Sequence, residues 1–120
     1  MTELNGECVV LSTCPTLEVA KSLAARLVSQ QLAACVNILP QVLSCYQWKG
    51  QVEQQVEHLL LIKTHSARFD DVAVCIRAMI PYEIPEILAL PVLGGSQDYL
   101  AWMAESMSVP ARPRGREHGE

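Results

Sequence analysis

The sequence predicts an α+β fold, a ferredoxin-like βαββαβ sandwich in which two helices cover one face of an antiparallel sheet. Two observations lead to this prediction. Segments with strand-like and helix-like apolar patterns follow one another in the order βαββαβ, and a short helix pattern ends the series. The two middle strands join directly at Lys49-Gly50, where a glycine can adopt the positive φ of a tight hairpin. We expect a single domain over residues 1–107.

The first strand is expected from Glu7 to Thr13, where apolar residues fill alternate positions on both faces. Cys14-Pro15-Thr16 ends it, and a helix is predicted from Thr16 to Gln31 with Glu18 in its first turn. The predicted buried stripe of this helix consists of Leu17, Ala20, Ala24, Leu27, Val28 and Gln31.

A long β-hairpin follows, with arms from Ala33 to Trp48 and from Gln51 to Thr64. Ordinary strands have roughly 5–6 residues, so these arms are too long for a small domain to cover by itself. We expect the arms to bend at Pro40, which removes a ladder donor, and the distal part to pair with another subunit. A well-filled monomer is the alternative.

The second helix is predicted after Ser66 as its cap, with Asp70 and Asp71 in the first turn and Pro81 beyond its end. Its predicted stripe consists of Phe69, Val72, Ala73, Ile76 and Met79. An apolar strand with edge character is expected from Glu86 to Val92.

The last helix is predicted from Gln97 to about Met107, after the turn Gly94-Gly95-Ser96. Such a turn before a helix can bind phosphate through its backbone amides, although more often it is a plain turn. Residues 108–120 are expected to form a disordered tail, since beyond Pro110 the chain has no apolar residue larger than alanine.

The composition excludes several classes of protein. The formal net charge is −4 and three of the nine basic residues lie in the tail, which argues against nucleic acid as a partner. No stretch approaches the roughly 20 apolar residues of a membrane span, and no secretory signal pattern is present, so we expect no membrane association and a cytoplasmic location. The five cysteines lack C-x-x-C spacing, which favours reduced thiols over a disulfide framework or a zinc site.

Two groups of residues are candidates for a binding site. Cys14, at a strand end beside a helix start, is structural, a reactive thiolate or a soft metal ligand. Charged residues next to apolar strands are costly unless they are paired or face a cleft, so they form either salt bridges or a ligand site. These charged residues are Glu57, Lys63, Glu83 and Glu86, and the aromatic residues that could line the same cleft, or pack in an interface, are Trp48, Tyr82 and Trp102.

Five motifs together closely resemble the CutA family of divalent-ion tolerance proteins, over roughly Val9 to Met103. They are LAACVNILP (Leu32 to Pro40), S-x-Y-x-W-x-G (Ser44 to Gly50), LLLIKT (Leu59 to Thr64), PYEIPEI (Pro81 to Ile87) and the segment from Gly94 to Trp102. The resemblance implies a PII-like homotrimer assembled through the long hairpin. It also implies a non-enzymatic role in copper and divalent metal-ion homeostasis, through binding of a metal ion or a small ligand.

Family members with a proposed copper site use a cysteine and one or two histidines at positions held here by Ser12, Met79 and Ile80. This chain lacks those ligands. Cys14 and Met79 are soft enough for Cu(I) and are the candidates for a substitute site.

Two other functions stay open. A small acylphosphatase-like hydrolase on the same fold would need a phosphate-binding loop with an arginine after the first strand, and Ser12 to Thr16 contains none. A structural trimer that anchors another protein is the third possibility.

Overall fold

The computed structural model describes residues 4–112 of the chain. Four strands, three α-helices and one 3₁₀ turn form one α+β unit, as predicted. In chain order they are β1 (Glu7–Cys14), α1 (Leu17–Ser29), β2 (Cys35–Trp48), β3 (Gln51–His65), η1 (Ser66–Arg68), α2 (Phe69–Met79), β4 (Leu88–Pro91) and α3 (Gln97–Met107).

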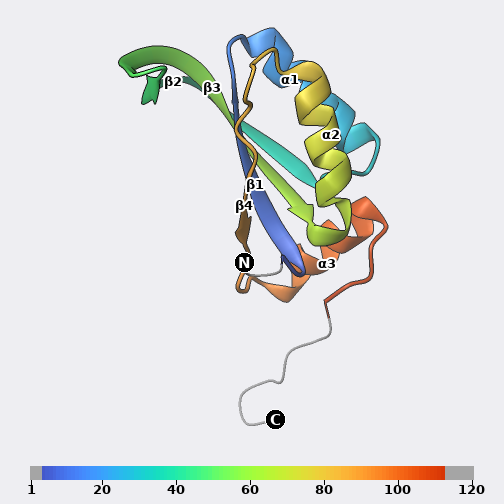
Figure 1. Cartoon of the computed structure of the whole chain (residues 1–120). Helices are drawn as coiled ribbons and strands as arrows, with labels where there is room; N and C mark the ends of the chain where they lie inside the picture. The colour runs from blue at the N-terminus through green and yellow to red at the C-terminus, as the bar shows by residue number, and fades with distance from the viewer. Residues whose placement is uncertain (1–3, 113–120) are drawn as a thin grey trace.

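The four strands form one antiparallel sheet in the order β2-β3-β1-β4, which is the ferredoxin-like order. Helices α1 and α2 lie on the same face of this sheet (Figure 1). The alternate residues Cys8, Val10, Ser12 and Cys14 of β1 are all fully buried, because they form the central row under these helices. Leu60 and Ile62 of β3 extend the same core.

Helix α1 begins where predicted, since the Thr16 hydroxyl accepts a hydrogen bond from the Val19 amide. Its buried face differs from the predicted stripe. The buried residues are Ala20, Leu23 and Leu27, whereas Val28 is 44% exposed. The predicted stripe ran towards Val28 and Gln31, which lie on a side of the helix that faces away from the sheet. It therefore missed Leu23, which faces the sheet.

Helix α2 is capped differently from the prediction. Ser66 is not its cap, because the Ser66 hydroxyl accepts a hydrogen bond from the Gly6 amide. His65 instead caps the 3₁₀ turn that precedes the helix, its Nδ1 accepting from the Ala67 amide at 3.0 Å. The predicted stripe holds at its centre, where Val72, Ala73 and Ile76 are buried.

The hairpin is as long as predicted and leaves the body of the molecule as a curved ribbon (Figure 1), which makes the chain 55 Å long but only 28 and 24 Å across. Lys49 and Gly50 both have positive φ, as a two-residue hairpin turn of the primed type requires. The pairing of β2 with β3 shifts between Leu39 and Val42, so the predicted bend at Pro40 is confirmed as a β-bulge.

Strand β4 is an edge strand, as predicted, but it spans only four residues. It pairs with β1 from Leu88 to Pro91, whereas Ile87 packs against the core and Glu86 lines a pocket described below. Helix α3 starts at the predicted turn, where the Ser96 hydroxyl accepts from the Tyr99 amide. The turn therefore serves as a helix cap.

The predicted disordered tail falls mainly on residues 113–120, which lie outside the described residues. Before that, Arg112 reaches back to the start of β1. Its Nη2 lies 2.7 Å from Glu7 Oε1, close enough for an ion pair although the N–H is not aligned for a hydrogen bond. The same nitrogen donates to the carbonyl of Val92.

The five cysteines are free thiols, as predicted. Cys8 and Cys14 are completely buried, and burial raises the pKa of Cys8 to about 11 and the pKa of Cys14 above its ordinary value. Because the thiolate is the reactive form, neither residue should react with iodoacetamide in the folded protein at pH 8. Peptide mass mapping should show both modified only after denaturation, and labelling of either under native conditions would contradict this packing.

Candidate functional site

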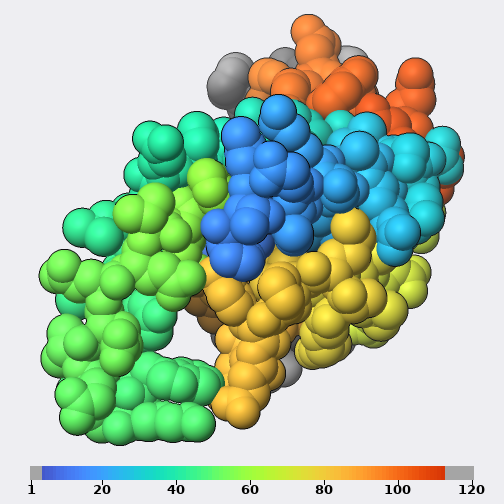
Figure 2. Space-filling view, turned by 90° about the horizontal axis from the view of Figure 1, so that it is seen from above, coloured from blue at the N-terminus to red at the C-terminus, as the bar shows by residue number. Residues whose placement is uncertain are grey.

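The described surface has a hollow where the hairpin leaves the sheet. A pocket of about 650 Å³ opens between the hairpin and the segment 82–86 that follows α2, and Figure 2 shows it between the green hairpin and the yellow segment. We call it the hairpin pocket. Aromatic rings and carboxylates dominate its wall, namely Tyr46, Trp48, Tyr82, Glu57, Glu83 and Glu86.

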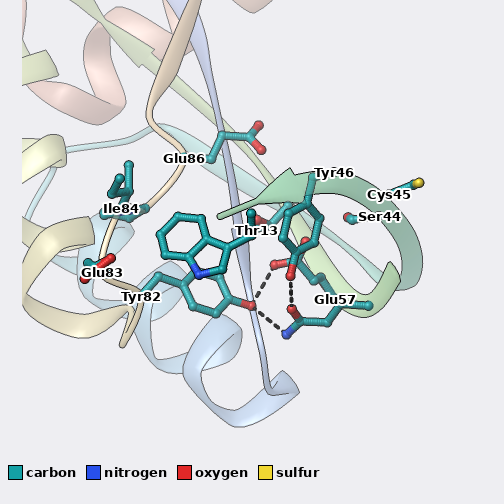
Figure 3. Close-up of a pocket in the computed structure, with 12 residues that line it drawn as sticks. Thr13, Ser44, Cys45, Tyr46, Glu57, Tyr82, Glu83, Ile84 and Glu86 are labelled. Carbon is teal, nitrogen blue, oxygen red and sulfur yellow. Dashed lines mark hydrogen bonds between the residues drawn. The ribbon is translucent and has the colours of Figure 1, made fainter. Parts of the chain in front are cut away.

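A row of hydrogen bonds crosses the floor of the hairpin pocket in one direction (Figure 3). The Tyr46 hydroxyl donates to Gln55 Oε1 at 2.7 Å, and Gln55 Nε2 donates to the Tyr82 hydroxyl at 3.4 Å. The Tyr82 hydroxyl then donates to Glu57 Oε2 at 2.6 Å. The row thus links both arms of the hairpin to the segment after α2 and ends on a carboxylate.

The electrostatics of the hairpin pocket are those of an acidic site. Glu57 is only 6% exposed, and the Tyr82 hydroxyl is its hydrogen-bond partner. Burial, together with the bond to Glu57, raises the pKa of Tyr82 well above its usual range. Burial and the negative charge of Glu57 raise the pKa of the Glu86 carboxyl.

The raised pKa of Glu86 implies that its ionisation destabilises the folded chain. The folded form holds this proton at pH values where the unfolded chain has already released it, so stability falls as pH rises through that window. The Glu86→Gln variant, which is neutral at every pH, should therefore have a higher Tm than the wild type at pH 7. The difference should vanish below about pH 4, where both states are protonated. An unchanged Tm at pH 7 would contradict this account.

The structure brings together five of the seven residues predicted to line a cleft: Trp48, Glu57, Tyr82, Glu83 and Glu86. The other two lie elsewhere: Trp102 is on helix α3, and Lys63 of β3 lies beside that helix. Lys63 Nζ is 3.5 Å from the hydroxyl of Tyr99 and 5.6 Å from the centre of its ring, and the Trp102 ring packs on Tyr99 at 5.3 Å. Lys63 comes six positions after Glu57 along an extended strand, which carries the two side chains to different parts of the fold.

The two predicted metal ligands lie in the main core. Cys14 is fully buried and its thiol donates to the Thr16 carbonyl at 3.4 Å, while Met79 packs against the same apolar cluster from α2. Ser12 and Ile80, at the family's ligand positions, are buried too. Among residues 4–112, no three His, Cys, Asp or Glu side chains come close enough to hold one metal ion.

Sequence reasoning missed two members of the row of hydrogen bonds, Tyr46 and Gln55. Both lie on the hairpin, and the signal for Tyr46 was present, since it shares a strand face with Trp48. Gln55 pairs with Ser44 in the hairpin register, two positions before Tyr46. Its role depends on Tyr82, which is 27 residues away in the chain.

Comparison with known proteins identifies the family. The family model described as CutA1 divalent ion tolerance protein matches residues 8–106. The chain belongs to this family. It is 46% identical over 100 residues to the divalent-cation tolerance protein CutA of Thermus thermophilus, covering 83% of this chain and 97% of that protein.

Other relatives agree with this assignment. Human protein CutA is 44% identical over 93 residues, which cover 78% of this chain but 52% of the human protein, so the chain spans about half of that relative. The solved CutA1 structure from Shewanella superposes with a TM-score of 0.83 at 33% identity, covering 91% of this chain and all of that one. The solved Thermus thermophilus structure gives a TM-score of 0.81. The expected CutA membership and fold are thereby confirmed.

Proposed function

We propose that this protein works as a non-enzymatic homotrimer in tolerance of divalent metal ions, and that the hairpin pocket is its ligand site. Membership of a family named for divalent-ion tolerance supports the first part. The cytoplasm is the proposed compartment. No helix in the part of the chain that the structure describes has the length and apolar character of a membrane span.

The observation that carries the homotrimer is the uncovered distal half of the hairpin. Leu43, Val52 and Val56 are 67%, 68% and 56% exposed in the single chain. Long strands with exposed apolar residues tend to pair with another chain, because pairing removes the apolar side chains from water. Two further copies of the same hairpin would cover these side chains within a closed ring, as cyclic symmetry allows.

The experiment uses cells that lack the gene, grown at elevated copper, zinc or cadmium. Restoring the wild-type chain should restore growth, whereas Leu43→Glu, which places a charge on the proposed contact, should not. Val74→Glu is the matched control, because Val74 is 59% exposed on α2, away from the hairpin. Equal growth of all strains would overturn the proposed role in tolerance.

Direct copper binding at Cys14 and Met79 is the second candidate. Both sulfur atoms belong to side chains of one core cluster and suit Cu(I). Copper binding there would require the core to open. It would also require the Cys14 thiol to ionise, although burial raises its pKa. Calorimetric titration of the reduced protein with Cu(I) under a competing chelator tests it. Stoichiometric binding that disappears in Cys14→Ser and Met79→Leu would support it, and weak binding that is unchanged in both would exclude it.

The other two candidates gain less support. A hydrolase of the acylphosphatase type would place an arginine in the turn between β1 and α1, and that turn holds Pro15 and Thr16. A trimer that only anchors another protein would not need the row of hydrogen bonds that fixes Glu57 in the pocket.

A further inference from the structure

The geometry of the hairpin pocket points to its ligand class: we propose that it binds a small organic cation, an alkylammonium group, between its aromatic rings and carboxylates. This inference deepens the proposed function and rests on it, since that function assigns ligand binding to the same pocket. It would give this protein a small-molecule ligand in place of a metal ion at the site.

The first argument is the composition of the wall. Tyr46, Trp48 and Tyr82 supply three aromatic rings, and none of the residues that line the pocket is basic. Aromatic faces attract cations through their quadrupole, with tryptophan the strongest, and this is the usual construction of sites for substituted ammonium groups. A cavity of about 650 Å³ falls within the size range of small-molecule sites.

The second argument is the direction of the hydrogen bonds. The hydroxyl protons of Tyr46 and Tyr82 are both donated inwards along the row that ends on Glu57. What the row leaves for a ligand are ring faces and acceptor oxygens. An anion would therefore meet repelling carboxylates and tyrosine hydroxyls whose protons are already donated, whereas a cation would meet ring faces and carboxylate oxygens.

The third argument is how the negative charge is distributed. Glu57, Glu83 and Glu86 line the pocket but do not converge into a cluster that could ligate one metal ion within the described residues. Glu57 comes from β3, whereas Glu83 and Glu86 come from the segment after α2. Charge spread over opposite walls suits a diffuse cation of several atoms better than a compact ion that requires ligands at about 2 Å.

The hairpin itself gives an example of the proposed contact. Lys49 Nζ lies 5.7 Å from the centre of the Trp48 ring, so an ammonium group already contacts this ring at the hairpin tip. The Tyr99 ring outside the pocket receives Lys63 in the same way. The pocket combines such ring faces with the nearly buried carboxylate of Glu57.

The test uses tetramethylammonium as the probe and tert-butanol as a neutral molecule of similar size. The chain has two tryptophans, so the full-length Trp102→Leu variant reports Trp48 fluorescence alone. Tetramethylammonium is expected to change this fluorescence saturably, and tert-butanol at least tenfold more weakly. Equal responses to both molecules, or no saturation, would overturn the proposal.

Calorimetry with the same probe separates the contributions of single residues. Glu57→Gln and Trp48→Leu should each weaken binding about two- to thirtyfold, the range of a cation–aromatic or charge contact. Trp102→Leu is the matched control, since Trp102 is similarly exposed but lies outside the pocket, and its affinity should equal that of the wild type. Unchanged affinity in both pocket variants would overturn the assignment of the site.

Light scattering on every variant keeps the two proposals apart. If a pocket variant keeps the mass of the wild type but no longer binds the cation, its loss of binding comes from the pocket and not from a loss of assembly. Failure of the wild type itself to form the trimer, or to support growth in metal, bears on the proposed function and leaves the measured cation binding standing. Methylammonium as a second probe shows whether N–H donation to Glu57 adds to the ring contacts, by binding more tightly than tetramethylammonium.

Discussion

The Leu23→Ala variant is expected to lose about 2–5 kcal/mol of unfolding free energy, the usual cost of truncating a fully buried leucine. Leu23 is completely buried in the cluster shared by α1 and the sheet, and its removal leaves a cavity between layers that are held by packing. Guanidinium denaturation followed by circular dichroism measures the loss. Both proteins must be compared at one concentration, because assembly makes stability concentration-dependent.

Val28→Ala is the matched control on the same helix. Val28 is 44% exposed, and a surface substitution of this kind should change the unfolding free energy by no more than about 0.5 kcal/mol. A loss for Val28→Ala as large as that for Leu23→Ala would contradict this packing, because Val28 would then have to face the sheet as the sequence predicts.

The Arg112→Ala variant is expected to lose about 3 kcal/mol, because it leaves a buried carboxylate without its counter-charge. Glu7 is only 2% exposed, and Arg112 is its ion-pair partner. The Val92 carbonyl loses a donor in the same change. Denaturation at pH 7 and low salt measures the loss.

A second variant attributes that loss to the charge. In the Glu7→Gln background, Arg112→Ala should cost much less, since a neutral amide needs no counter-ion, and the difference between the two backgrounds is the coupling energy of the pair. Additive losses would show that Arg112 stabilises the chain through packing and the Val92 carbonyl alone.

Most of the fold could be predicted from the sequence, because its strongest signals are local. Alternation along β1, the Lys49-Gly50 turn and the cap at Ser96 each depend on a few neighbouring residues. The bulge could also be predicted, since Pro40 cannot donate to the ladder. The start of α2 could not, because the Ser66 hydroxyl is used by Gly6, sixty residues away in the chain.

The candidate site could be predicted only in part, since it depends on which distant segments meet. Charged and aromatic residues near apolar strands pointed to Glu57, Tyr82 and Glu86, which share the pocket. The same criterion also selected Lys63, but the ammonium group of Lys63 lies beside the Tyr99 hydroxyl instead. Composition identifies side chains that need a partner, but the course of the bent hairpin decides which partner each one meets.

The measurement that tests the central claim most directly is the mass of the full-length protein by light scattering after size-exclusion chromatography at micromolar concentration. The uncovered hairpin predicts a particle of three times the 13.2 kDa chain mass, and Leu43→Glu should reduce it. A wild-type mass of 13.2 kDa would contradict the account, because the distal hairpin would then be stable in water without another chain to cover it.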